Sequence, residues 1–209
     1  MLISHRFKFI VINIPKTASN SYRDKLNKYT DVWGERLHQT IEEPKRFYQH
    51  DSLPKIKERF VLNNWDIDQY FKYVTIRNPW QRYASYYMWA KKHEDSQYLY
   101  LDNKHLSTLF NKYNSKQEKI LEQIIVYNLS QDNFLLIDNK ECVDYIARLE
   151  TIDEDFNKLC EILNIPKTKL LHRNKSERYD YRELYTQKLI DLVYEKEKYV
   201  IEKYKYSFE

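Results

Sequence analysis

Residues 7–21 read FKFIVINIPKTASNS, and this stretch decides the expected fold. Residues 7–14 are almost all apolar and rich in β-branched side chains, a pattern that predicts a strand covered on both faces, as in the centre of a parallel sheet. A proline ends the strand, a tight loop follows, and residues 19–28 are expected to form a helix with Ser19 or Asn20 as its N-cap. The stretch therefore predicts a strand, a tight loop and a helix in that order.

The same order of elements recurs at residues 70–93. Residues 70–76 (YFKYVTI) predict a second strand, and the polar turn RNP at residues 77–79 opens a helix that should end at His93. Strands that alternate with helices predict an α/β fold, here a P-loop-like, three-layer arrangement with a central, mostly parallel sheet flanked by helices. Ligands of such folds bind beyond the carboxyl ends of the strands, where both polar loops are expected.

Apolar residues at helical spacing predict further helices. These cover residues 53–60, 117–129, 152–163 (with Thr151 as N-cap) and 189–204. Two short apolar runs, residues 134–137 and 143–149, are candidate strands. The C-terminal part is thus expected to be mainly helical.

Length and composition predict one soluble domain over residues 1–209. Hydrophobic residues make up 42% of the chain, which excludes a disordered tail. The 35 Lys and Arg residues nearly balance the 31 Asp and Glu residues, so the net charge of +4 excludes a strongly basic nucleic-acid coat. No apolar run reaches the roughly 18 residues of a membrane span. The two cysteines, Cys142 and Cys160, indicate a reducing, cytoplasmic location rather than a disulfide framework.

The single glycine, Gly34, limits the kinds of phosphate site that this chain can build. Glycine-dependent dinucleotide and Walker A signatures are absent, so any anion must be held by helix ends and side chains. The segment from Pro15 to Ser21 offers both, because the N–H groups of a helix start, short polar side chains and Lys16 form a cradle suited to a phosphate. The alternative for this segment alone is an ordinary helix cap beside a surface lysine.

A second cationic segment follows the second strand. Arg77 stands at the strand end and can hold a second phosphate with its forked guanidinium, while Ser85 lies about two helical turns later and can donate its hydroxyl. Arg82 lies on another face of that helix than Ser85 and is expected to brace the loop by pairing with a carboxylate. No metal site is expected, because the cysteines and His172 lack the spacing of a ligand set.

Together, the two segments resemble the donor-binding motifs of sulfotransferases that use 3′-phosphoadenosine-5′-phosphosulfate (PAPS). Residues 15–21 (PKTASNS) are similar to the loop that binds the 5′-phosphosulfate, and residues 77–87 (RNPWQRYASYY) are similar to the motif that binds the 3′-phosphate. The order of the motifs and their strand context agree with this family, and the likeness covers most of the chain. Within the family, the chain looks most like the carbohydrate branch, of the 2-O-sulfotransferase kind.

The resemblance implies an enzyme that moves a sulfuryl group from PAPS to a hydroxyl of a glycan or similar acceptor and releases 3′,5′-adenosine bisphosphate (PAP), with no metal. Lys16 would stabilise the charge that grows on the leaving phosphate.

Golgi members of the family carry an N-terminal anchor, whereas here a strand is predicted close to Met1, so a cytoplasmic enzyme of bacterial or viral type is expected. The donor-binding residues carried over from the motifs and from a late basic loop are Lys16, Thr17, Ala18, Ser19, Asn20, Ser21, Arg77, Ser85 and Arg173.

Two positions of the first loop depart from the family pattern. Ala18 stands where many members have Gly, and a helical φ at this position would be compatible with the exchange. Asn20 replaces the more usual Thr or Ser, and its carboxamide can still donate to a phosphate.

The attacking hydroxyl benefits from a general base, and a histidine that titrates near neutrality suits this task. The chain has six histidines. In the carbohydrate branch the base comes from between the two phosphate motifs, which leaves His38 and His50. His50 stands just before a predicted helix and resembles the family position, so it is the expected base. His38, a carboxylate, or catalysis without a base are the alternatives.

Two other functions are compatible with parts of the pattern. A kinase-like P-loop protein would bind a nucleotide, but the chain lacks Gly-Lys-Ser/Thr and an evident Mg²⁺ carboxylate. A nucleotide- or nucleic-acid-binding module without transferase activity would use the mild basicity and the many aromatic residues. The sulfotransferase hypothesis needs neither a nucleic-acid partner nor a membrane span.

Overall fold

The computed structural model describes residues 1–35, 43–95, 100–101, 104–170 and 180–209. The chain divides into two compact units, each with its own hydrophobic core. The first unit comprises Met1–Arg77 and Asn133–Lys175, and the second comprises Asn78–Asp132 and Ser176–Glu209. A single domain over residues 1–209 stays a prediction.

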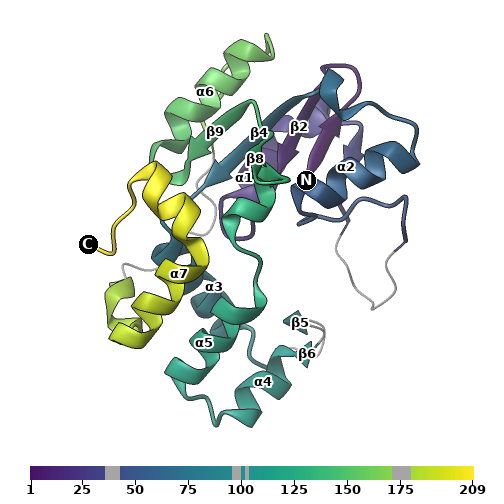
Figure 1. Cartoon of the computed structure of the whole chain (residues 1–209). Helices are drawn as coiled ribbons and strands as arrows, with labels where there is room; N and C mark the ends of the chain where they lie inside the picture. Colours follow the sequence, from purple (N-terminus) through teal and green to yellow (C-terminus); the bar gives the residue numbers. More distant parts are fainter. Residues whose placement is uncertain (36–42, 96–99, 102–103, 171–179) are drawn as a thin grey trace. The chain divides into compact units, whose positions relative to one another are not determined.

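The first unit is built on a five-stranded sheet with the strand order β3-β1-β2-β4-β9 (Figure 1). β2, β4 and β9 are parallel, and β1 is antiparallel to both of its neighbours, so β1 alone among these five runs in the opposite direction. The predicted α/β class with a mostly parallel sheet is confirmed. The bounds of these strands are β1 Leu2–Ser4, β2 Phe9–Ile12, β3 Val32–Trp33, β4 Phe71–Ile76 and β9 Tyr145–Arg148.

The parallel register brings the ends of three strands to one edge of the sheet. Ile12 of β2 pairs with Val74 of β4, and Ile76 of β4 pairs with Arg148 of β9. β2 leads into the loop before α1, while Arg77 follows β4 directly. Both polar segments of the sequence therefore leave the sheet at the edge where ligands of parallel sheets bind.

Strand residues on both faces of this sheet are buried. On one face, α1 (Ser19–Leu26) and α6 (Ile152–Ile162) contribute to a core that also contains Tyr73 and Ala147. Several strand residues that point to the opposite face, such as Ile10, Val74 and Ile76, are also fully buried. Burial on both faces explains why the strand sequences are continuous apolar runs without alternation.

The predicted helices form close to their expected bounds, because their start signals are local. Asn78 caps α3 by accepting a hydrogen bond from the N–H of Gln81 at 3.2 Å, and α2 follows Ser52 with Pro54 in its first turn. The remaining bounds are α2 Leu53–Leu62, α3 Pro79–Lys92, α5 Gln117–Tyr127 and α7 Gln187–Tyr204.

Other elements were not predicted or differ from the prediction. α4 (Leu106–Lys112) completes the seven α-helices of the described residues, and the strands β1 and β3 are too short to show a period in the sequence. The run 134–137 yields β7 (Leu136–Ile137), which pairs with β8 (Lys140–Glu141) outside the main sheet. The remaining short elements are β5 Tyr100–Leu101, β6 Lys104–His105, η1 Asn27–Tyr29, η2 Ile67–Gln69, η3 Gln131–Phe134, η4 Leu149–Thr151 and η5 Tyr181–Leu184.

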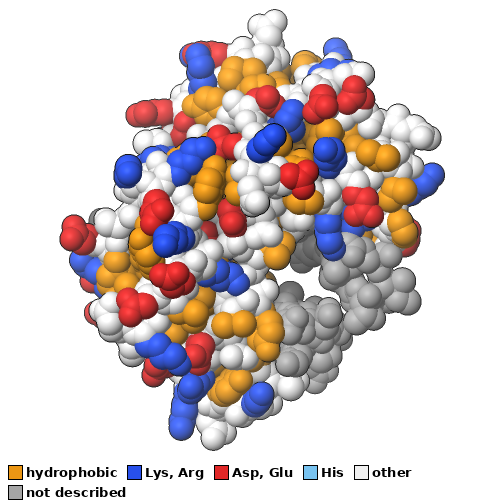
Figure 2. Space-filling view, viewed as in Figure 1, with side chains coloured by type: hydrophobic (Ala, Val, Ile, Leu, Met, Phe, Trp, Pro, Cys, Tyr) orange, Lys and Arg blue, Asp and Glu red, His pale blue; other side chains and the backbone are white. Residues whose placement is uncertain are grey.

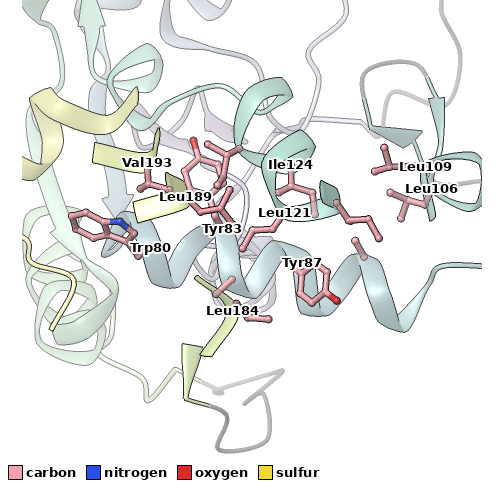
Figure 3. Packing of buried hydrophobic residues seen from close by; sticks show 14 of the residues in the cluster. Trp80, Tyr83, Tyr87, Leu106, Leu109, Leu121, Ile124, Leu184, Leu189 and Val193 are labelled. Atoms are coloured by element: carbon pink, nitrogen blue, oxygen red, sulfur yellow. The ribbon is translucent and has the colours of Figure 1, made fainter. Parts of the chain in front are cut away.

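The second unit is helical, and its core lies between α3, α5 and α7. Figure 3 shows how side chains of these helices interdigitate. The labelled core residues are Trp80, Tyr83, Tyr87, Leu106, Leu109, Leu121, Ile124, Leu184, Leu189 and Val193.

None of the described helices is both long enough and apolar enough to span a membrane.

A buried ion pair joins α3 to α7 within this core. Nη2 of Arg82 donates to Oε1 of Glu197 at 2.6 Å, and both side chains are at most 1% exposed. The same Glu197 carboxylate accepts from the hydroxyl of Tyr83 and from the backbone N–H of Gln131. The helix loses its regular geometry at Glu197. The predicted pairing of Arg82 with a carboxylate is confirmed, but the pair connects α3 to α7 and does not brace the loop after β4, as was predicted.

Candidate functional site

The loop between β2 and α1 is shaped by two residues with left-handed backbone. Lys16 has a φ of 72° and Ala18 a φ of 67°. Ala18 is also the N-cap of α1, and its carbonyl accepts the N–H of Ser21 at 2.9 Å. The predictions of an N-cap at Ser19 or Asn20 and of a helical φ at Ala18 were therefore wrong. A left-handed φ strains a residue with a Cβ, which explains why glycine suits this position.

The side chains of the loop differ in how far they are exposed to solvent. The Thr17 side chain is buried, and its Oγ1 donates to the backbone oxygen of Ile14 at 2.9 Å, which closes the loop on itself. Ser21 is buried, Ser19 is half-buried, and Asn20 is exposed. The hydroxyl of Thr17 therefore has a structural role in the loop.

Two cations meet beside this loop. Nη1 of Arg77 donates to the backbone oxygen of Lys16 at 3.3 Å, so the residue after β4 contacts the loop after β2. Burial and, secondly, the charge of Arg77 lower the pKa of the Lys16 ammonium from 10.5 to about 8. Two positive groups held together out of water raise the free energy of the folded protein, and a bound anion would lower it.

Buried hydroxyl groups connect the helix after the loop to the strand before Arg77. The Tyr22 hydroxyl lies 2.7 Å from Oγ1 of Thr75 and 3.0 Å from the hydroxyl of Tyr73. Burial raises the pKa of Tyr22, so this phenol stays neutral and acts as a structural hydrogen-bonding group. The contact fixes α1 against the end of β4 and so helps to hold Lys16 beside Arg77. Sequence analysis missed it, because a tyrosine on the apolar face of a helix gives no sign of its partner.

His50 lies at the same corner of the first unit. Its Nδ1 is 2.9 Å from the backbone oxygen of Asn13, the residue that follows β2. A carbonyl oxygen only accepts, so Nδ1 must carry the proton, and Nε2 of the neutral ring is then the basic nitrogen. The side chain is exposed, which leaves it accessible to a reactant. This is the arrangement that a general base needs.

The first unit thus brings together three of the predicted groups, namely residues 16–21, Arg77 and His50. Ser85 is half-buried on α3 and belongs to the second unit. The predicted adenine-binding Arg173 and the alternative base His38 lie outside the described residues. Over the described part of the chain, no group of three or more His, Cys, Asp or Glu side chains could hold a metal ion.

Comparisons with known proteins assign the chain to a family. The chain belongs to the sulfotransferase family, whose model matches residues 1–208. The solved structure called "Crystal Structure of Sulfotransferase from Alicyclobacillus acidocaldarius" is similar with a TM-score of 0.49 and 11% sequence identity, over 96% of each chain. A similarity at that level supports no conclusion about this chain. The search of curated proteins found no match.

The left-handed φ of Ala18 predicts a stabilising substitution. Ala18→Gly should raise the free energy of unfolding by about 0.5–1 kcal/mol, because the relief of strain exceeds the added entropy of the unfolded chain. Urea denaturation measures this change. Ala84→Gly is the matched control: Ala84 lies inside α3, so the same exchange should destabilise by about 1 kcal/mol. A loss of stability in both variants would contradict the left-handed conformation.

The lowered pKa of Lys16 predicts how the affinity for a phosphate ligand depends on pH. Only protonated Lys16 attracts the anion, and a bound phosphate raises the pKa of Lys16 above its free value of about 8. Affinity for PAP should therefore be constant near pH 7 and fall as the pH rises through 8 to 9, with uptake of a proton on binding. Calorimetry in buffers of different ionisation enthalpy measures both quantities.

Lys16→Arg is the control for that titration. A guanidinium keeps its proton throughout this pH range, so the variant should bind PAP with a flat profile. An equal decline in the wild type and in Lys16→Arg would assign the titration to another group.

Proposed function

We propose that this sulfotransferase uses PAPS as donor and transfers its sulfuryl group to a hydroxyl of a glycan or similar acceptor. The observation that carries the proposal is the contact of Lys16 with Arg77 at the edge where β2 and β4 end. A buried lysine whose pKa is lowered in part by a neighbouring arginine is suited, together with that arginine, to a ligand with several negative charges. PAPS and its product PAP are such ligands.

The proposed donor-binding roles are those that the resemblance of the two motifs implies. Lys16 and the backbone N–H groups at the start of α1 would hold the 5′-phosphosulfate, since a helix N-terminus attracts anions. Arg77 would hold the 3′-phosphate through its guanidinium, and Ser85 would add a hydroxyl. Arg173 remains the candidate for the adenine side of the donor.

PAPS supplies a sulfuryl group on a good phosphate leaving group. Transfer needs a cation where negative charge develops, and an ammonium at Lys16 would act there more strongly in the transition state than before it. Because Lys16 is half-buried, little water needs to reorganise around its charge. By analogy with phosphoryl transfer, the protein contributes mainly positioning and charge stabilisation.

His50 would remove the proton from the acceptor hydroxyl. The bond from Nδ1 to the Asn13 oxygen selects the tautomer with a basic Nε2. Asn13 is three residues before Lys16, so the base is tied to the start of the loop that carries the proposed charge-stabilising group. This assignment supports a carbohydrate-type mechanism, in which the base comes from between the two phosphate motifs.

A nucleotide- or nucleic-acid-binding module without transferase activity is the alternative. Such a surface would gather positive side chains, since phosphate contacts dominate nucleic-acid affinity. On the face shown in Figure 2, Lys and Arg side chains are interspersed with Asp and Glu side chains. Neither this face nor the family match favours the alternative.

Calorimetric titration with PAP, 5′-AMP and Mg-ATP tests the proposed donor. PAP should bind more tightly than 5′-AMP, because Arg77 recognises the 3′-phosphate. Arg77→Ala and Lys16→Ala should each weaken PAP binding by about 10- to 100-fold, the cost of losing a charge-assisted hydrogen bond. Arg77→Ala should also abolish the preference for PAP over 5′-AMP.

Lys28→Ala is the control, because it removes one exposed positive charge beyond the end of α1. It should leave PAP affinity unchanged. Equal binding of PAP and 5′-AMP, or a preference for Mg-ATP, would contradict the proposal. Radiolabelled sulfate transfer from PAPS to a panel of oligosaccharides then identifies the acceptor.

A further inference from the structure

The turn that carries His50 is attached to α2 by a buried ion pair. Nε of Arg59 donates to Oδ2 of Asp51 at 2.9 Å, and both side chains are only 5% exposed. Asp51 directly follows His50 in the chain. A pair this deeply buried is costly to desolvate and is stable only when further hydrogen bonds complete it.

Several further contacts of the pair involve residues 43–51. Nη1 of Arg59 donates to the backbone oxygens of Glu43 and Pro44 at 2.9 and 2.8 Å. Its guanidinium lies over the ring of Tyr48, 4.9 Å from the centroid. The carboxylate oxygen that binds Arg59 also accepts the backbone N–H of Tyr48 at 2.7 Å. One arginine therefore ties both ends of this segment to α2.

His50 itself is exposed, so its position depends on the backbone that carries it. Its ring meets the Asn13 oxygen at 2.9 Å, and a displacement of the turn by about 1 Å would lengthen this bond beyond the range of a hydrogen bond. Without that bond, the two neutral tautomers of the ring would both be populated, and Nε2 would no longer be the basic nitrogen in every molecule.

We propose that Arg59 and Asp51 are positioning residues for His50. The buried pair fixes the turn, and the turn keeps Nδ1 on the Asn13 oxygen, so that Nε2 is the basic nitrogen of the neutral ring. The inference rests on the proposed function, since His50 acts as a base only there. Neither Arg59 nor Asp51 touches a reactant.

The tautomer of His50 is the readout that tests this role. Long-range ¹H–¹⁵N spectra of the full-length protein distinguish Nδ1–H from Nε2–H, and His50→Gln identifies the His50 signals. The wild type should show Nδ1–H. Arg59→Lys keeps the charge but cannot make directed bonds to Asp51 and to two carbonyl oxygens, so it should shift His50 to a mixture of both tautomers.

Arg46→Lys is the matched control. Arg46 belongs to the same segment, but its ion pairs with Glu35 and Glu43 are exposed, so the His50 tautomer should not change. If Arg59→Lys does not fold, Asp51→Asn/Arg59→Gln removes both buried charges together and decides the matter. A His50 ring that stays fully in the Nδ1–H form in a folded Arg59 variant would overturn the proposal, as would Nε2–H in the wild type.

PAP titration of the same samples separates this proposal from the proposed function. Arg59→Lys should bind PAP as the wild type does, since Lys16 and Arg77 are unchanged. A wild type that binds no PAP refutes the donor assignment but leaves the tautomer result valid. A changed tautomer with unchanged PAP affinity supports the positioning role, and an unchanged tautomer refutes it whatever the PAP affinity.

Discussion

The parallel pairing of β2 with β4 is the constraint on which the candidate site depends. Its register, with Ile12 opposite Val74, makes both strands end at the same edge. The residues that follow the strands then have to meet, and Arg77 contacts the Lys16 backbone as a result. A slip of the register would separate the two cations and would also turn every strand side chain to the wrong face.

The candidate site contains two unfavourable features, a buried lysine beside a second cation and a strained backbone conformation. Lys16 is drawn out of water beside a second cation, which lowers its pKa, and Ala18 is held in a left-handed conformation. Buried contacts elsewhere in the first unit offset these costs, among them the Tyr22–Thr75 hydrogen bond and the Arg59–Asp51 ion pair. Unfavourable local geometry that the surrounding structure maintains is typical of functional sites. An anion bound at this site, as proposed, would relieve the repulsion.

Much of the fold was predictable because its signals are local. The apolar runs of β2 and β4 and the capping residue Asn78 are each readable within a few positions. β1 was not predictable, because three residues show no period and its strand state depends on pairing with β2 and β3. The left-handed φ of Ala18 was also missed, since an alanine in the sequence gives no sign of positive φ.

The candidate site also combines residues that could be predicted from the sequence with contacts that could not. Lys16 and Arg77 could be selected from residue type and strand context, and His50 from the family resemblance. The structure places all three in the first unit. Their supporting contacts could not be selected: Tyr22 and Thr75 are 53 positions apart, and nothing in either segment marks the other as a partner. The roles of Ser85 and Arg173 stay predictions.

A crystal structure of the protein with PAP bound tests the central claim most directly. The account predicts the 5′-phosphate against the start of α1 with Lys16 in contact, and the 3′-phosphate on the guanidinium of Arg77. PAP bound with neither cation in contact would contradict the claim that this edge of the sheet is the donor site.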